Sequence, residues 1–203
     1  MATEQKSIGS SPGTWRVFIA AELPPNIQQA LAVVRQLLPA RHSGTIRWLP
    51  LDGIHLTLRF LGDVDRDRVA SIADRMSAAA AQTGRFQLEL AGTGCFPAPE
   101  RPRVFWVGLR GDLQRLSQLH GRIEGGLSAI GIGVDPRPFH PHLTVGRDAT
   151  NSRPYEVQAA GYSFARVAVE PGHRFEVSAV TLFRSHLTSD GARYESLRTS
   201  ALG

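Results

Sequence analysis

The chain has very little cysteine and lysine: one of each among its 203 residues, Cys95 and Lys6. A single cysteine cannot form an internal disulfide, which is compatible with a reducing compartment such as the cytosol. We interpret Cys95 as a small packed hydrophobic residue rather than a nucleophile. Nearly all of the positive charge is arginine, and the formal net charge is +5. Because arginine binds phosphate oxygens in a bidentate manner, this balance favours a polyanionic partner.

Long apolar runs and several nucleotide-binding signatures are also missing. No stretch approaches the roughly 20 apolar residues that span a bilayer, so we expect no membrane contact and a cytoplasmic protein. There is no P-loop and no Gly-x-Ser-x-Gly elbow, and Gly131-x-Gly133 lacks the third glycine of a dinucleotide fingerprint. We expect residues 1–13 to form a disordered leader and residues 14–200 to form one domain of two lobes.

Hydrophobic periodicity predicts an α+β fold. The predicted strands cover residues 16–22, 45–49, 54–61, 86–90, 104–109, 142–145, 175–186 and 192–197. The predicted helices cover residues 27–38, 69–76 and 113–130. Asp63 or Asp65 is expected to cap the second helix and Asp112 the third. An irregular connection is expected over residues 92–102, and no element is assigned between 148 and 174. The arrangement that fits best is two antiparallel sheets, each with helices on its outer face.

A four-residue motif occurs twice and is the strongest functional signal. His55-Leu56-Thr57-Leu58 returns as His142-Leu143-Thr144-Val145, and the two histidines are 87 residues apart (55 to 142). Alternate side chains of a strand point to opposite faces, so each motif presents a histidine and a threonine on one face and apolar side chains on the other. The spacing indicates an ancient duplication that gave two related lobes.

Two histidines and two threonines facing one cleft can carry out acid–base chemistry on a phosphate. One neutral imidazole removes a proton from water, a protonated one supplies a proton to the leaving oxygen, and the threonine hydroxyls stabilise the phosphoryl charge. A zinc site made by His140, His142 and His55 is the alternative, but no acidic residue lies close in sequence to complete it. We expect no metal and no cofactor.

Segments spread from Arg16 to Tyr194 carry a family resemblance. They are residues 16–20, 46–50, 55–62, 101–106, 138–147, 182–185 and 191–194. With the paired motifs, they resemble the two-histidine (2H) phosphoesterases, in the branch of RNA 2′,3′-cyclic phosphodiesterases formerly called 2′-5′ RNA ligases. Members of this branch often have Arg or Lys where this chain has His140, and Ala where it has Gly146.

The resemblance implies a two-lobed fold with both motifs in a central cleft. The reaction it implies is metal- and ATP-independent hydrolysis of a terminal RNA 2′,3′-cyclic phosphate to a 2′-phosphate. By position, His55 would be the proton donor and His142 the proton acceptor, with Thr57 and Thr144 on the phosphoryl oxygens. The partner would be RNA with a cyclic phosphate end, tRNA fragments included, and the protein would be a monomer.

Two arginines are candidate substrate-binding residues. Arg59 has the same strand parity as His55 and Thr57, so it should point into the cleft if the strand continues regularly. Arg147 breaks the parity of its own motif, but the family has an arginine at this place. A solvated or structural arginine is the alternative in both cases.

Other functions remain open at this stage. The same site would serve 2′-5′-linked oligonucleotides or small cyclic nucleotides, by hydrolysis or by the reverse ligation. A module that binds RNA termini without turnover is a third possibility, although such a module has no need of two titratable groups so placed.

Overall fold

The computed structural model describes residues 13–42, 44–149, 152–188 and 191–203. Of the expected leader, all but Gly13 lies outside the described residues, as do Ser189 and Asp190 between the last two predicted strands. No helix in the described part of the chain is long and apolar enough to cross a membrane.

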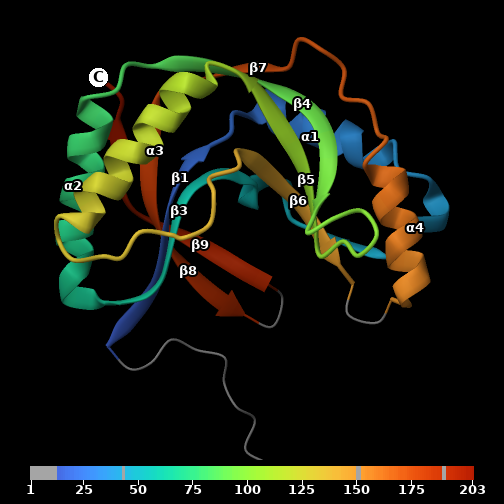
Figure 1. The fold of residues 1–203 in the computed structure, drawn as a ribbon, viewed down its shortest axis with the longest axis horizontal. Helices are drawn as coiled ribbons and strands as arrows, with labels where there is room; N and C mark the ends of the chain where they lie inside the picture. Colours follow the sequence, from blue (N-terminus) through green and yellow to red (C-terminus); the bar gives the residue numbers. More distant parts are fainter. Residues whose placement is uncertain (1–12, 43, 150–151, 189–190) are drawn as a thin grey trace, which may run out of the picture.

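The described chain contains four α-helices and nine strands (Figure 1). The helices are α1 (Pro25–Gln36), α2 (Val69–Ala81), α3 (Leu113–Ser128) and α4 (Pro154–Phe164). The strands are β1 (Thr14–Glu22), β2 (Ile46–Trp48), β3 (His55–Asp65), β4 (Phe86–Phe96), β5 (Val104–Gly111), β6 (His142–Asp148), β7 (Arg174–Val177), β8 (Ala179–Thr188) and β9 (Gly191–Ala201).

All the strand pairs are antiparallel, and the strands follow the order β7-β4-β5-β6-β3-β1-β8-β9, with β2 paired to β6. The predicted α+β architecture with two lobes is confirmed, but the two expected sheets are joined into one. They meet where Leu56 of β3 pairs with Leu143 of β6. The lobes are therefore β3-β1-β8-β9 on one side of this pair and β6-β5-β4-β7 on the other.

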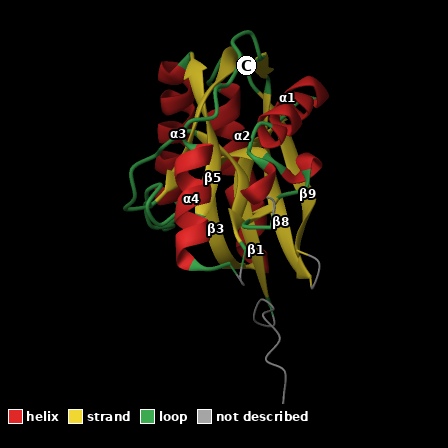
Figure 2. Ribbon diagram, turned by 90° about the vertical axis from the view of Figure 1, so that its right-hand side faces the viewer, coloured by secondary structure: helices red, strands yellow, loops and turns green. Residues whose placement is uncertain are grey.

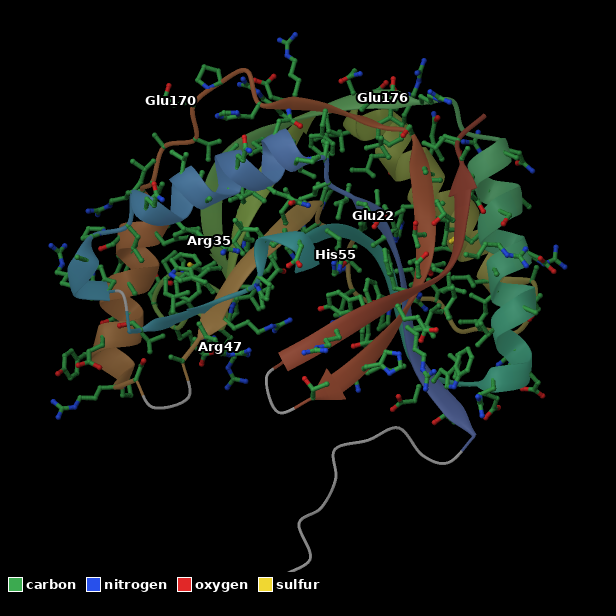
Figure 3. All side chains as sticks on the ribbon, turned by 180° about the vertical axis from the view of Figure 1, so that it is seen from behind. Glu22, Arg35, Arg47, His55, Glu170 and Glu176 are labelled. Atoms are coloured by element: carbon green, nitrogen blue, oxygen red, sulfur yellow. The ribbon has the colours of Figure 1, made fainter. Side chains whose placement is uncertain are left out.

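Each lobe combines segments from both halves of the chain. Helices α2 and α3 pack against each other on the β3-β1-β8-β9 lobe, and α2 contacts β8 and β9. Helix α1 belongs to the other lobe, because Arg35 donates to the carbonyl of Val145 in β6 and its guanidinium lies 5.5 Å from the Trp48 ring in β2. Figures 1 and 3 show α1 and α4 together on one side of the molecule and α2 and α3 on the other.

The helices form where apolar residues recur every three or four positions. The predicted stripe of α2 is buried, with Ile72 and Met76 fully inaccessible. Asp112 caps α3 as predicted, since its side chain accepts from the backbone N–H of Arg115 at 3.1 Å. The prediction for α2 is wrong: Asp63 lies within β3, and Asp65 precedes a short 3₁₀ turn without making a side-chain cap.

Three further sequence assignments need correction. Strand β4 continues through residues 92–96 of the expected irregular connection, because Gly92 has φ +56° and a bulge lies between Ala91 and Thr93; residues 97–102 are irregular as predicted. Helix α4 fills part of the region that was left unassigned. The long strand expected over residues 175–186 is two strands, of which β7 pairs with β4 in one lobe and β8 with β1 in the other. Figure 2 shows the described chain starting at the end of the molecule opposite the C-terminus.

Candidate active site

The two motifs are presented as their alternation predicts. In β3 the Leu56 and Leu58 side chains are buried in the core, and in β6 Leu143 and Val145 are buried likewise. The four motif side chains on the other face are half-buried; they are His55, Thr57, His142 and Thr144. Figure 3 shows His55 on the concave side of the curled sheet. Each strand thus uses its aliphatic side chains as anchors and leaves its polar ones accessible from the space between the lobes.

The pairing of β3 with β6 brings the motifs together. Leu56 pairs with Leu143, so extending the antiparallel register by one residue places His55 opposite Thr144 and Thr57 opposite His142. A histidine of one motif therefore lies beside the threonine of the other. The arrangement has an approximate two-fold axis through the Leu56–Leu143 pair.

Both imidazole rings are held by the same backbone contact. Nδ1 of His55 lies 2.9 Å from the carbonyl oxygen of Gly53, and Nδ1 of His142 lies 2.6 Å from the carbonyl oxygen of His140. A carbonyl only accepts, so Nδ1 carries the proton in both rings and donates it. Nε2 is left as the catalytic atom, an acceptor when the ring is neutral and a donor when it is protonated.

Aromatic rings contact both histidines, but His55 has more of them than His142. The His55 ring stacks on Phe18 at 4.7 Å between centroids and meets the edge of Tyr194 at 5.2 Å. The His142 ring has one perpendicular neighbour, Phe96, at 5.0 Å. Phe18 in turn stacks on Phe183, with which it forms a small buried cluster on this face of the sheet.

These surroundings favour the neutral form of both imidazoles. Burial lowers the pKa of His55 to about 4, although its hydrogen bond to Gly53 acts in the opposite direction. Burial also lowers the pKa of His142; the hydrogen bond to the His140 carbonyl opposes this shift, and the charges of His140 and Arg147 add to it. An anionic phosphate bound between the rings favours their protonated forms, so substrate binding and protonation are linked.

A pocket of about 140 Å³ opens at the motifs. It is lined by Phe18, Leu49, Gly53, His55, Thr57, Phe60, Thr144, Arg147, Ser185 and Tyr194. The predicted His142 is not among these lining residues. Sequence reasoning missed the other six, which are Phe18, Leu49, Gly53, Phe60, Ser185 and Tyr194. One signal was available for Phe60: it follows His55 by five residues, as Arg147 follows His142.

A bulge in each motif strand explains where the two candidate arginines lie. The register of β3 against β1 skips Leu58, and the register of β6 against β5 skips Val145. Each bulge falls on the fourth residue of its motif and reverses the parity of the strand beyond it. Arg147 is therefore turned to the pocket, whereas Arg59 is turned to the core, and the expectation that Arg59 points into the cleft is wrong.

Arg59 instead holds the loop that leads to the second motif. Its side chain is 7% exposed and forms ion pairs with Glu124 of α3 at 3.1 Å and with Asp135 at 3.4 Å. It also donates to the carbonyl of Gly133. Asp135 and Gly133 belong to the segment between α3 and β6, and the same segment supplies the His140 carbonyl that orients His142. The strand of the first histidine is thus tied to the loop of the second.

Trp48, Phe139 and Cys95 do not line the pocket. Trp48 and Phe139 pack against the core, and Phe139 stacks on His120 at 4.1 Å. Cys95 is buried, as expected for a packed side chain, and burial raises its pKa to about 12. Across the ranges that the structure describes, no group of three His, Cys, Asp or Glu side chains is arranged to hold a metal ion.

Comparison with known proteins agrees with this arrangement. The model of the LigT-like phosphoesterase family matches the chain twice, over residues 21–106 and 107–194, and each match contains one motif. An RNA 2′,3′-cyclic phosphodiesterase of Aeropyrum pernix is 36% identical over 147 residues, which are 72% of this chain and 80% of the relative. One of Escherichia coli is 29% identical over 92% of this chain and 96% of its own length.

Solved structures show the same fold. Escherichia coli LigT in its apo form superposes with a TM-score of 0.73 at 26% identity, covering 94% of this chain and 98% of LigT. LigT complexed with 3′-AMP superposes equally well, with 27% identity over 93% of this chain and 98% of LigT. The paired matches, the relatives and the shared fold together establish that the chain belongs to the LigT-like phosphoesterase family.

Proposed function

We propose that this protein hydrolyses the 2′,3′-cyclic phosphate at the end of an RNA, leaving a 2′-phosphate. The observation that supports the proposal is the duplicated motif: its two histidines have the same Nδ1 anchor, its strands pair at Leu56 and Leu143, and His55, Thr57 and Thr144 line one pocket. The names of the relatives, RNA 2′,3′-cyclic phosphodiesterases, support the choice of substrate. A short RNA ending in a cyclic phosphate, tRNA fragments included, is the substrate class.

The reaction uses the two imidazoles in complementary protonation states. His142 accepts a proton from water through Nε2 as the water oxygen attacks phosphorus. His55 donates a proton from Nε2 to the O3′ oxygen as the P–O3′ bond breaks. Proton transfer of this kind contributes roughly 10²–10⁴-fold in rate for each group. His55 acquires its proton together with the anionic substrate, because the phosphate charge offsets the low pKa that burial imposes.

The hydroxyl groups and one arginine bind the phosphate. Thr57 and Thr144 donate hydrogen bonds to the non-bridging oxygens, on which charge increases in the transition state. Arg147 lines the pocket and supplies a positive charge that does not depend on pH. Arg59, committed to Glu124 and Asp135, makes no substrate contact. All these groups belong to the chain itself. We propose that the enzyme acts as a monomer, without metal or cofactor, in the cytoplasm.

The test is hydrolysis of a short RNA with a 2′,3′-cyclic phosphate end in the presence of EDTA. The wild type should form the 2′-phosphate, and His55→Ala and His142→Ala should each lose at least about 10²-fold in kcat. His186→Ala is the matched control, because this histidine lies on β8 and pairs with Glu195 on the surface. Equal loss in the control, or full activity in either motif variant, would contradict the mechanism.

Three outcomes would point to the other functions. Turnover of a 2′-5′-linked oligonucleotide or a small cyclic nucleotide, without turnover of the RNA end, would assign a different substrate. Tight binding of the RNA end with no product would indicate a binding module. Activity that EDTA abolishes and a divalent metal restores would assign a metal to the site.

A further inference from the structure

The connection between α3 and β6 carries the backbone oxygen that orients one of the two histidines. It comprises residues 129–141, contains no helix or strand, and crosses from the lobe of α2 and α3 to the start of β6 (Figure 1). Within the described chain, its backbone hydrogen bonds run from residues 129–132 to the end of α3. From Gly133 onward it is held by side chains. The position of the His140 carbonyl, and with it that of the His142 ring, depends on these side chains.

His55 does not have this dependence. Gly53, whose carbonyl oxygen holds its ring, lies in a 3₁₀ turn only two residues earlier in the chain. This turn is closed by a backbone hydrogen bond of 3.1 Å from the N–H of Gly53 to the carbonyl of Pro50. The anchor of the first histidine is therefore fixed by its sequence neighbours, whereas the anchor of the second depends on residues distant in the chain.

Side chains from three elements meet at Asp135 of the connection. Arg59 of β3 lies 3.4 Å from its carboxylate and also donates to the carbonyl of Gly133. Glu124 of α3 accepts from the backbone N–H of Asp135 at 3.4 Å and pairs with Arg59 at 3.1 Å. Arg137 binds the same carboxylate at 2.7 Å, but it belongs to the connection itself. Arg59 and Glu124 are therefore the contacts that fix Asp135 relative to β3 and α3.

The last part of the connection is stiff. Among residues 135–141, each one except Phe139 is a proline or directly precedes a proline, because prolines occupy positions 136, 138 and 141. Proline has its φ fixed near about −65°, and the residue before it is restricted to extended backbone. Phe139, the exception, stacks on the ring of His120 at 4.1 Å between centroids. A displacement of Asp135 is therefore passed on to the His140 carbonyl rather than absorbed between them.

We propose that Arg59 positions the Nε2 atom of His142 for its role as proton acceptor. It acts through Asp135 and the proline-rich end of the connection, and it touches neither the substrate nor the imidazole. The described residues of β3 and β6 pair at Leu56 and Leu143 alone, so Arg59 provides a second link between the strands of the two histidines. This positioning role rests on the proposed function and adds to it the residue that places the acceptor.

Steady-state hydrolysis of a dinucleotide with a 2′,3′-cyclic phosphate end tests the kinetic consequence. Asp135→Asn weakens the ion pair with Arg59 at nearly constant size, so kcat should fall at least about tenfold while KM stays within about twofold of the wild type. Pro138→Ala leaves the ion pairs intact but frees the connection, and it should have the same effect. Arg59→Lys should retain more activity than Arg59→Gln, because lysine keeps the charge without the planar fork. A raised KM with unchanged kcat would overturn the proposal.

Double-mutant cycles separate the positioning of His142 from a general loss of structure. In His142→Gln there is no imidazole to position, so adding Asp135→Asn should change the residual kcat by less than about twofold. In His55→Gln the acceptor is still present, and the same addition should cost the full factor seen in the wild type. Equal costs in the two backgrounds would contradict an action through His142.

Arg68→Lys is the matched control. Arg68 donates to the carbonyl of Ile130 at 2.6 Å, near the start of the same connection. Gly131 and Gly133 lie between this contact and Asp135, and glycine has the backbone freedom to absorb a displacement. Arg68→Lys should therefore leave kcat within about twofold of the wild type. A loss as large as that of Asp135→Asn would overturn the proposal, because any contact to the connection would then have the same effect.

NMR titration of the imidazoles in the free protein tests the link without turnover. The hydrogen bond to the His140 carbonyl raises the pKa of His142, so loosening it should lower that pKa. Arg59→Lys changes no charge and should move the titration of His142 to lower pH while leaving that of His55 in place. His140 and Arg147, whose charges also act on the His142 ring, are present in both proteins.

The NMR result distinguishes failure of this proposal from failure of the proposed function. An unchanged titration of His142 in Arg59→Lys would overturn the positioning role, whatever the activity. A wild type that does not hydrolyse the RNA end would remove the proposed function, whereas a shifted titration of His142 would still show that Arg59 places this ring.

Discussion

Arg59 and Gly146 occupy the same place in the two motif strands, one residue beyond each bulge, and both are turned to the core. At this place one strand carries the longest cationic side chain and the other carries none. The neighbouring residues explain this difference. Arg59 meets Glu124 and Asp135, whereas Gly146 lies against Ile46 and Trp48 of β2. The two positions therefore have the same place in the strand, but the surroundings of one accommodate an arginine and those of the other leave no room for a side chain.

Replacing Arg59 should destabilise the protein strongly. Arg59→Ala leaves Glu124, which is 11% exposed, without its arginine partner, whereas Asp135 keeps Arg137 at 2.7 Å. Breaking a buried ion pair in this way costs about 3–5 kcal/mol. Urea denaturation measures the loss, and Arg47→Ala, at an exposed position of β2, should stay within about 0.5 kcal/mol of the wild type. Adding Glu124→Gln should recover part of the loss; no recovery would mean that the unpaired charge is not its origin.

Replacing glycine by alanine should lower the free energy of unfolding at one position and raise it at another. A Cβ atom at Gly146 would lie 2.6 Å from Cγ2 of Ile46 and 3.0 Å from Cε3 of Trp48, so Gly146→Ala should cost about 1–3 kcal/mol of stability. At Gly121, inside α3, a Cβ atom would meet nothing within 4 Å, and Gly121→Ala should stabilise by about 0.5–1 kcal/mol.

Thermal denaturation of the two glycine variants provides the comparison. If the close contact is the cause at Gly146, the cost should shrink in an Ile46→Ala background, where the clashing methyl group is gone. An undiminished cost in that background would refute the explanation. The result also bears on the alanine that relatives were expected to carry here: such a chain needs a smaller or displaced neighbour at the position of Ile46.

The free energy of unfolding should decrease as the pH is lowered, and the protonation of His55 should account for part of this decrease. The folded state holds the pKa of His55 at about 4, below the ordinary value of 6.5, so between these values the unfolded chain binds more protons than the folded one. Stability present above pH 6.5 is thus lost as pH decreases toward 4, by at most about 1.4 kcal/mol per pH unit for this one group.

Urea denaturation at pH 7 and pH 5 separates the His55 contribution. His55→Gln removes the titration and keeps a polar side chain, so its free energy of unfolding should depend less steeply on pH than that of the wild type. His142 is present in both proteins and cancels from the difference. Parallel curves for the two proteins would show that the His55 imidazole is not desolvated as described.

The secondary structure was predictable where one face of an element is buried and the pattern is regular. The stripe of α2 and the capping Asp112 were read correctly because they depend on neighbouring residues alone. Helix α4 was missed because Ala160, Gly161 and Phe164 are its only buried residues, which leaves little periodicity. The break between β7 and β8 was hard to predict, because the alternation of Phe175 and Val177 ends in four consecutive buried residues, Val180 to Phe183.

The site was predictable as far as the motifs extend. The His and Thr side chains follow from strand alternation, so His55, Thr57, His142 and Thr144 share the expected face. The prediction for Arg59 failed one residue later, because a bulge is set by the pairing of strands distant in sequence and leaves no mark in a single motif. The pocket residues Ser185 and Tyr194 come from the other half of the chain, so only the tertiary structure brings them to His55.

The exchange of segments between the lobes has a consequence for how such a molecule could arise. Strands β1 and β3 depend on β8, and β5 and β6 depend on β4, so neither half closes a lobe by itself. A half-length ancestor with one motif would have reached this architecture only as an intertwined homodimer. In a homodimer, the residue at the position of Phe60 is the residue at the position of Arg147, so both must be the same amino acid. Joining the copies into one polypeptide freed the two positions to diverge, and in this chain one is aromatic and the other cationic.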